Sequence, residues 1–149
     1  MCFTVFFTGD SVSAEVTSEY EVLDGNFVRR VFDQMPQKVK TGMLFDVYGA
    51  LLNEHRRTVL SFWIDEDYSL SEIAEEMNIT RQGVHDTIKK CEKWLFDTEM
   101  RLGVVSRMMI QNELIKRYQR NERADDKTVD SLLEQIMHVW EENPWPLKD

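Results

Sequence analysis

The 149-residue chain combines 42% hydrophobic with 30% charged residues, an ordinary composition for one soluble core with a small appendage. It has no run approaching the roughly 20 apolar residues that cross a bilayer, and its two cysteines lack the spacing of a metal site or of a disulfide framework. These features exclude a membrane-spanning protein and a disulfide-stapled scaffold, and they favour a cytoplasmic protein with no metal, cofactor or membrane partner.

The N-terminal segment 1–38 is expected to be a short irregular appendage. Its apolar start, CFTVFF, lacks a basic lead-in and a clear small-residue cleavage site, so it makes a poor signal peptide. Residues 12–16 alternate like a strand, and residues 27–32 suit a short helix. Because this segment is too short for a core of its own, it must pack on the helical body or stay poorly ordered.

The segment 39–103 is expected to form a helix-turn-helix domain that opens with two amphipathic helices. The first is marked by Leu44, Phe45, Val47, Tyr48, Leu51 and Leu52, and the second by Val59, Leu60, Phe62 and Trp63. An acidic run at residues 65–67 follows. Without further ligands, or the Gly and Glu of a calcium loop, this run is expected to be a solvated turn.

Residues 69–90 predict two short helices joined by a sharp turn. Ser69 caps the first helix, and Glu72 at its third position completes a capping box. Thr80 caps the second helix, while Asn78 stands at the turn, where a left-handed backbone is needed. The apolar residues that keep both helices on a shared core are Leu70, Ile73, Ala74, Met77, Ile79, Val84 and Ile88. This is the pattern of a helix-turn-helix.

The solvent face of the second helix carries the candidate contacts to double-stranded DNA, because the start of this helix enters the major groove in known complexes. Arg81 can fork onto guanine, Gln82 can pair with adenine, and His85 can donate to either. Asp86 repels phosphate unless it accepts from a cytosine amino group or pairs with an arginine. The complete candidate set is Arg81, Gln82, His85, Asp86, Lys89, Lys90 and Lys93, with the lysines neutralising phosphate.

The overall charge opposes DNA binding. The chain holds 27 acidic and 18 basic residues, a formal net charge of −9, which repels nucleic acid at long range. Residues 43–103 hold 12 acidic and 7 basic residues, a net charge of −5. Only residues 80–93 are locally positive, with 4 basic and 2 acidic residues. The same fold also serves as a protein-docking module, so charge leaves both functions open.

The second helix of the motif is expected to continue for about twenty residues, because apolar positions alternate by four and three. The series consists of Val84, Ile88, Cys91, Leu95 and Leu102, with only Thr98 breaking it. Trp94, Phe96 and Met100 widen the apolar surface further. Either residues 104–142 fold back over this helix, or the helix mediates a homodimer, which would place two reading helices on one face of the duplex.

The C-terminal segment 104–149 predicts two more helices that serve packing or dimerisation. Residues 108–118 suggest a long helix, and residues 132–140 an amphipathic last helix before an extended Pro144-Trp145-Pro146 tail. The polar run between them is expected to be a connector rather than a phosphate or RNA contact. Acidic neighbours neutralise its arginines, Arg117, Arg120 and Arg123. The predicted fold class is thus an all-α helical bundle.

Three stretches are specific in combination: DVYGALL, DEDYSLSEIAEE and ITRQGVHDTIKKCEKWL. With them, the region from about Met43 to Leu102 resembles the YlxM family of small bacterial helix-turn-helix proteins. The resemblance implies an all-helical fold like sigma-factor region four, often dimeric. It also implies a gene beside those of the signal recognition particle GTPase or its receptor, and hence a regulatory role in or around that pathway.

The resemblance implies that the recognition-helix positions of the family correspond to Arg81, Gln82, Asp86 and Lys89. It implies no enzymatic activity. Gly83 stands where the family usually has alanine, which weakens the helix by up to about 1 kcal/mol. His85 replaces a usual aromatic residue. Residues 1–34 lie outside the resemblance, and family members tend to begin near the position of Met35, so we expect the true start to lie later.

Two functions from different classes follow, and both are non-enzymatic. The histidines at 55, 85 and 138 have no nucleophile or metal-ligand partner by spacing, and no phosphate-cradling glycine loop exists. The first function is a homodimeric DNA-binding regulator. The alternative is an adaptor that binds the signal recognition particle GTPase, its receptor or its RNA. Exposed apolar residues on 94–102 would favour the adaptor, and a basic patch around 81–93 would favour DNA binding.

Overall fold

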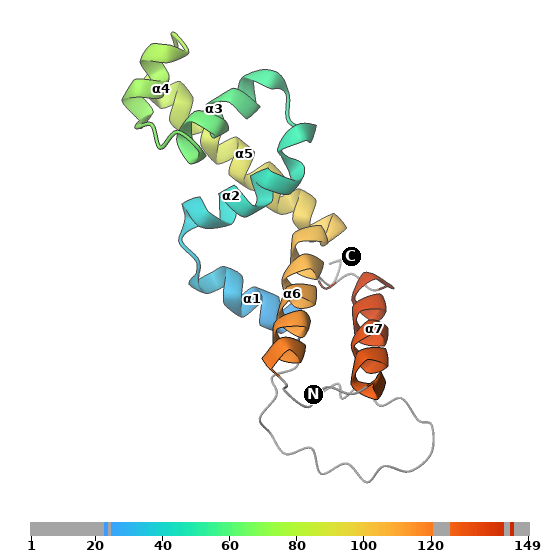
Figure 1. Cartoon of the computed structure of the whole chain (residues 1–149). Helices are drawn as coiled ribbons and strands as arrows, with labels where there is room; N and C mark the ends of the chain where they lie inside the picture. Colours follow the sequence, from blue (N-terminus) through green and yellow to red (C-terminus); the bar gives the residue numbers. More distant parts are fainter. Residues whose placement is uncertain (1–22, 24, 121–125, 142–143, 145–149) are drawn as a thin grey trace.

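The computed structural model describes residues 23, 25–120, 126–141 and 144, and within them every regular element is a helix (Figure 1). The elements are α1 (Gly25–Gln34), α2 (Gln37–Tyr48), the 3-10 turn η1 (Gly49–Leu51), α3 (Glu54–Ile64), α4 (Leu70–Glu76), α5 (Arg81–Leu102), α6 (Val104–Arg120) and α7 (Asp126–Glu141). The prediction of an all-α fold is confirmed. None of the described helices is both long and apolar enough to cross a bilayer.

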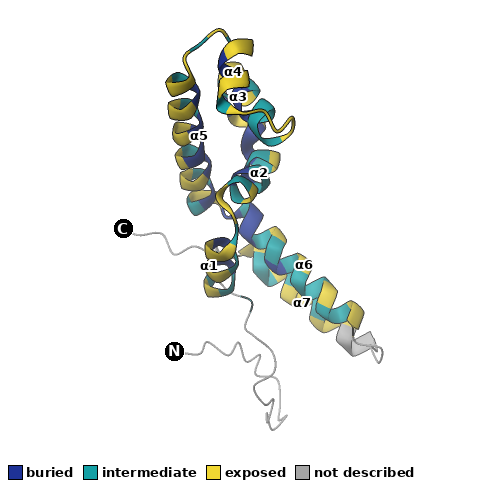
Figure 2. Cartoon of the chain, turned by 90° about the vertical axis from the view of Figure 1, so that its left-hand side faces the viewer, coloured by how far each residue is buried: buried dark blue, intermediate teal, exposed yellow. Residues whose placement is uncertain are grey.

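Helix α5 is the central element, and α2, α3 and α4 all pack against it. Its side that faces these helices is buried and its opposite side is exposed (Figure 2). Val59 and Leu60 of α3, Ile73 of α4, and Val84 and Leu95 of α5 are completely buried. One apolar core therefore fixes the direction of α5 and leaves one long face of it in solvent.

The predicted helix over residues 27–32 is confirmed as α1, which contributes Val28 and Phe32 to the core. The strand expected at residues 12–16 and most of the tail expected at residues 144–146 lie outside the described residues. Met35 and Pro36 separate α1 from α2. The residue before a proline disfavours the helical conformation, so α1 ends before Pro36 and α2 begins directly after it. The division of the chain after residues 38 and 103 stays a prediction.

Helix α5 ends at Gly103, which adopts the left-handed backbone with φ 62°. Glu99, one turn earlier, is fully buried and accepts hydrogen bonds from the first amides of α6. The Val105 amide lies 3.1 Å and the Ser106 amide 2.8 Å from its carboxylate, and the Tyr48 hydroxyl donates at 2.6 Å. A carboxylate is favourable at the start of a helix, so Glu99 sets the angle between α5 and α6.

The apolar series predicted along α5 is wrong beyond Leu95. Glu99 rather than residue 98 takes the next core position, and Leu102 is 48% exposed. A strict alternation by four and three drifts around a helix of 3.6 residues per turn, so the series leaves the buried face of α5 as the helix lengthens.

The expected folding back of residues 104–142 over α5 occurs only at the last turns of α5. Helix α6 contacts α5 near Glu99, packs on α1 and α2, and then extends away from the body, and α7 runs alongside it (Figure 1). The Arg107 guanidinium donates to the Val139 carbonyl at 3.1 Å, and the Trp140 indole donates to Gln111 at 2.9 Å. These two bonds tie the end of α7 to the first half of α6.

The arginines that end α6 are paired within their own helix. Arg117 and Arg120 both lie near the carboxylate of Glu113, at 3.6 and 3.1 Å. Arg123 lies outside the described residues. Arg117 and Arg120 thus belong to α6, and residues 121–125 of the connector expected over residues 119–127 lie outside the described residues.

Candidate nucleic-acid interface

The helix-turn-helix forms from local signals in the sequence. Ser69 accepts from the Glu72 amide while the Glu72 carboxylate accepts from the Ser69 amide, so the predicted capping box is present. Asn78 has φ 51°, the left-handed conformation expected at the turn. The Thr80 hydroxyl caps α5 by accepting from the Gly83 amide at 3.0 Å. These bonds set where α5 begins and hence which side chains form its first turns.

The packing of α4 on α5 decides which face of α5 is exposed. Ile73 and Ala74 are buried against α5, and Val84 and Ile88 face them. The Ile79 amide donates to the Ala74 carbonyl at 3.0 Å, which closes the turn between the helices. The candidate reading residues therefore lie on the side away from this contact.

All of the predicted contact residues are on α5 and all are exposed. They are Arg81, Gln82, His85, Asp86, Lys89, Lys90 and Lys93. Within the described residues, no carboxylate forms an ion pair with Arg81, Lys90 or Lys93. Three cations along one helix thus remain available to an anionic partner.

Asp86 organises the polar side chains at the start of α5. The Gln82 amide nitrogen donates to the Asp86 carboxylate at 2.8 Å, and the His85 ring nitrogen Nδ1 lies 3.5 Å from the same oxygen. The side-chain oxygen of Gln82 stays an acceptor. Asp86 therefore holds the side chains of both Gln82 and His85.

Lys89 is held by a carboxylate that sequence reasoning did not single out. Its ammonium lies 2.8 Å from Glu92, which is only 8% exposed and also accepts from the Thr41 hydroxyl at 3.4 Å. The Lys89 side chain is thereby directed toward α2. The spacing in the sequence could have indicated that Glu92 is buried. It follows the buried Ile88 by four residues, so both lie near one face of the helix.

Acidic residues border this interface on the α4 side. Glu72, Glu75 and Glu76 are exposed on α4, and the two hydrogen bonds with Ser69 lower the pKa of Glu72 below its usual range. In the turn before α4, Asp67 forms an ion pair with Lys38, which lowers the pKa of Asp67. The first helix of such motifs lies near the phosphate backbone, so these carboxylates oppose close approach of DNA there.

Comparison with known proteins agrees with this architecture. Residues 35–136 match the model of the family UPF0122, described as "Putative helix-turn-helix protein, YlxM / p13 like". A UPF0122 protein of Clostridium botulinum is 38% identical over 84 residues, covering 56% of this chain and 77% of the relative. A UPF0122 protein of Lacticaseibacillus casei is 34% identical over 106 residues, covering 69% of this chain and 94% of the relative.

A further relative, from Clostridium perfringens, is 36% identical over 112 residues, covering 70% of this chain and the whole relative. The matched region contains α2 to α6 completely, including the entire interface described above. Helix α1 lies before it. The similarity thus extends beyond the motif to the elements that position it, and the chain belongs to the UPF0122 family of YlxM/p13-like helix-turn-helix proteins.

Proposed function

We propose that this protein is a non-enzymatic regulator that binds double-stranded DNA through the exposed face of α5. The observation that carries the proposal is the exposed row of base-reading and cationic side chains on α5, oriented by a capped helix-turn-helix. In complexes of such motifs the second helix lies in the major groove. Membership in a helix-turn-helix family supports the same conclusion.

Each side chain of the row has a role that follows from its place on α5. Arg81 and Gln82, in the first turn, address base edges, with Arg81 suited to guanine and Gln82 to adenine. Lys90 and Lys93 lie further along the helix and neutralise phosphates. Asp86 keeps Gln82 and His85 in place and favours cytosine through its remaining acceptor capacity.

The proposal includes a homodimer, because motifs of this kind read two half-sites with two-fold symmetry. Support comes from an apolar stripe on α7, the side chains of which face solvent. The stripe consists of Val129, Leu133, Met137 and Trp140, which are 36%, 54%, 66% and 46% exposed. A second copy that covers this stripe would remove apolar surface from water.

The test measures binding by fluorescence anisotropy with short duplexes selected by the protein from a random-sequence library, over a range of salt concentrations. We expect sequence-selective binding that weakens with salt, with a slope near 0.9 per phosphate contact. Arg81→Ala should cost about 1–3 kcal/mol and relax the sequence preference. Lys90→Ala should weaken binding evenly across sequences and lower the salt slope by about one.

The matched control is Lys116→Ala, which removes an exposed lysine from α6, away from the interface. It should leave affinity and slope unchanged. If the library yields no enriched sequence and the protein does not bind duplexes at low salt, the proposal is refuted.

A second candidate function is an adaptor in the signal recognition particle pathway. It is supported by the acidic border formed by α4 and its preceding turn, and by the exposure of Phe96 and Leu102, at 41% and 48%. The test is a titration with the purified targeting GTPase, its receptor and its RNA. Binding of a protein partner that survives Arg81→Ala and Lys90→Ala would favour this function over DNA binding.

A further inference from the structure

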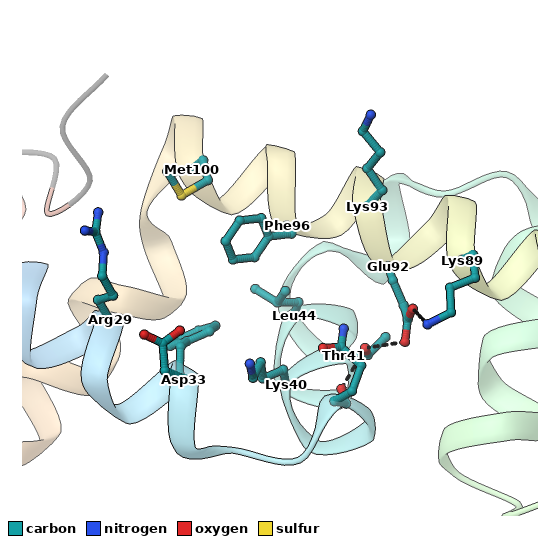
Figure 3. Close-up of a pocket in the computed structure, with 12 residues that line it drawn as sticks. Arg29, Asp33, Lys40, Thr41, Leu44, Lys89, Glu92, Lys93, Phe96 and Met100 are labelled. Carbon is teal, nitrogen blue, oxygen red and sulfur yellow. Dashed lines mark hydrogen bonds and ion pairs between the residues drawn. The ribbon is translucent and has the colours of Figure 1, made fainter. Parts of the chain in front are cut away.

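A cavity of about 520 Å³ lies between α1, α2 and α5, within the size range of small-molecule sites (Figure 3). Helix α1 contributes Arg29, Phe32 and Asp33. Helices α2 and α5 supply the remaining walls. The α1 wall precedes residue 35, where the family match begins, so the cavity combines matched and unmatched parts of the chain.

Part of the cavity wall is apolar, and each of the three helices contributes to that part. Phe32 and Leu44 are buried beneath it, at 2% and 3% exposure. Phe96 and Met100 form the α5 side, and 41% of the Phe96 side chain remains exposed (Figure 3). A flat aromatic group placed here would lie against the Phe96 ring and the side chains of α2.

The edge of the cavity is cationic, in a chain whose net charge is −9. Arg29, Lys40, Lys89 and Lys93 line it, against the carboxylates of Asp33 and Glu92.

Glu92 is neutralised by Lys89 at 2.8 Å and satisfied further by Thr41. Within the described residues, no ion pair engages Arg29, Lys40 or Lys93. Because the Lys93 ammonium points out of the cavity, Arg29 and Lys40 against Asp33 leave a surplus of one positive charge, which favours an anionic ligand.

We propose that this cavity binds a small phosphorylated aromatic molecule of about mononucleotide size. The aromatic ring of the ligand lies on the Phe96 side, and its phosphate forms ion pairs with Arg29 and Lys40. Asp33, on the same edge, limits the bound charge to a monophosphate, because additional negative charge would meet its carboxylate. Lys93 also lines the cavity, but its ammonium points away from Leu44 and Thr41, out of the cavity (Figure 3).

The site has a consequence for DNA that rests on the proposed function. Lys89 and Lys93 belong both to the cavity edge and to the proposed DNA-binding face of α5. An anion bound beside these residues adds negative charge next to the duplex. Ligand binding should therefore lower DNA affinity, and DNA should lower ligand affinity by the same factor.

The experiment is isothermal titration calorimetry of the full chain with AMP, with adenosine and inorganic phosphate as comparison probes. We expect saturable binding of one AMP per chain, tighter than either comparison probe. Arg29→Gln and Lys40→Gln should each weaken AMP binding about tenfold, while Lys90→Gln, an exposed lysine of α5 outside the cavity, should not. Phe96→Ala should weaken AMP binding and leave phosphate binding unchanged.

The proposal is overturned if AMP does not saturate the protein at millimolar concentration, or if adenosine binds as tightly as AMP. It is also overturned if Lys90→Gln weakens binding as much as Lys40→Gln does, since the effect would then reflect general charge. Circular dichroism of each variant shows whether the fold is intact, and the phosphate titration separates loss of the aromatic contact from loss of the anion site.

Anisotropy with the selected duplex, with and without saturating AMP, separates the two proposals. AMP binding without any DNA binding refutes the DNA function and leaves the cavity site supported. DNA binding that saturating AMP does not change refutes the coupling between the two.

Discussion

Replacing Glu99 by alanine should destabilise the protein more than any other single change to a charged residue of α5. The carboxylate is fully buried and accepts from the Tyr48 hydroxyl, the Val105 amide and both donors of Ser106. It is the only link of this kind between α2, α5 and the start of α6 in the described part of the chain. Its removal leaves four buried donors without their acceptor.

The magnitude follows from these contacts. A hydrogen bond to a charged group contributes about 1.5–3 kcal/mol, but the cost of burying the carboxylate offsets much of the sum. Because breaking one side of a buried charged network costs about 3–5 kcal/mol, we expect Glu99→Ala to lower the free energy of unfolding by that amount. Glu99→Gln keeps the side-chain volume and one acceptor oxygen, but its NH₂ group faces the hydrogen-bond donors that the carboxylate accepted from. Its expected cost is therefore about 2 kcal/mol.

The assay is urea denaturation followed by far-ultraviolet circular dichroism, with Asp97→Ala as the control. Asp97 is an exposed carboxylate on the same helix, and its loss should change stability by less than about 0.5 kcal/mol. If Glu99→Ala unfolds at the same urea concentration as the control variant, the argument that Glu99 fixes α6 on the body is refuted.

Three further predictions concern single residues. Burial, together with the hydrogen bond and charge of Glu99, raises the pKa of Tyr48 above its usual 10.0. The stability contributed by the neutral phenol is therefore complete below about pH 10 and is lost as pH rises further, so wild type should lose more unfolding free energy than Tyr48→Phe across that alkaline range in urea titrations. Asn78→Ala should cost about 1–2 kcal/mol, because φ is 51° there, whereas Asn78→Gly should be close to neutral in thermal melts; equal losses would contradict the backbone argument. Cys91 is fully buried and its pKa is raised by that burial, so in a Cys2→Ser background its thiol should react with Ellman's reagent only slowly until urea unfolds the chain. Fast reaction of the folded protein would show that the core around Cys91 opens readily.

The parts of the fold that sequence analysis predicted are those set by near neighbours. The capping box at Ser69, the left-handed Asn78 and the Thr80 cap each depend on residues within four positions, so their spacing carries the information. The exposed face of α5 followed from the same register. Helical periodicity also located α1, because Val28 and Phe32 lie one turn apart.

The parts that were missed depend on distant partners. Glu92 and Glu99 are buried because they bond to Thr41 and Tyr48, each 51 residues away in the chain. In the sequence both glutamates resemble the solvent-facing acids around them. The cavity beside Phe96 was missed for the same reason. Its walls come from three helices, and the periodicity of the sequence does not specify how these helices approach one another.

The attachment of α7 has a consequence for how the molecule opens. Helix α7 packs on α6, and none of its described side chains is fully buried. A helix with so little buried surface forms a separate cooperative unit, which unfolds locally at a lower cost than the whole chain. Its amides should therefore exchange with solvent deuterium while those of α5 stay protected. The apolar stripe on α7, which we propose joins two copies, can then fold and unfold on its own while α5 stays folded.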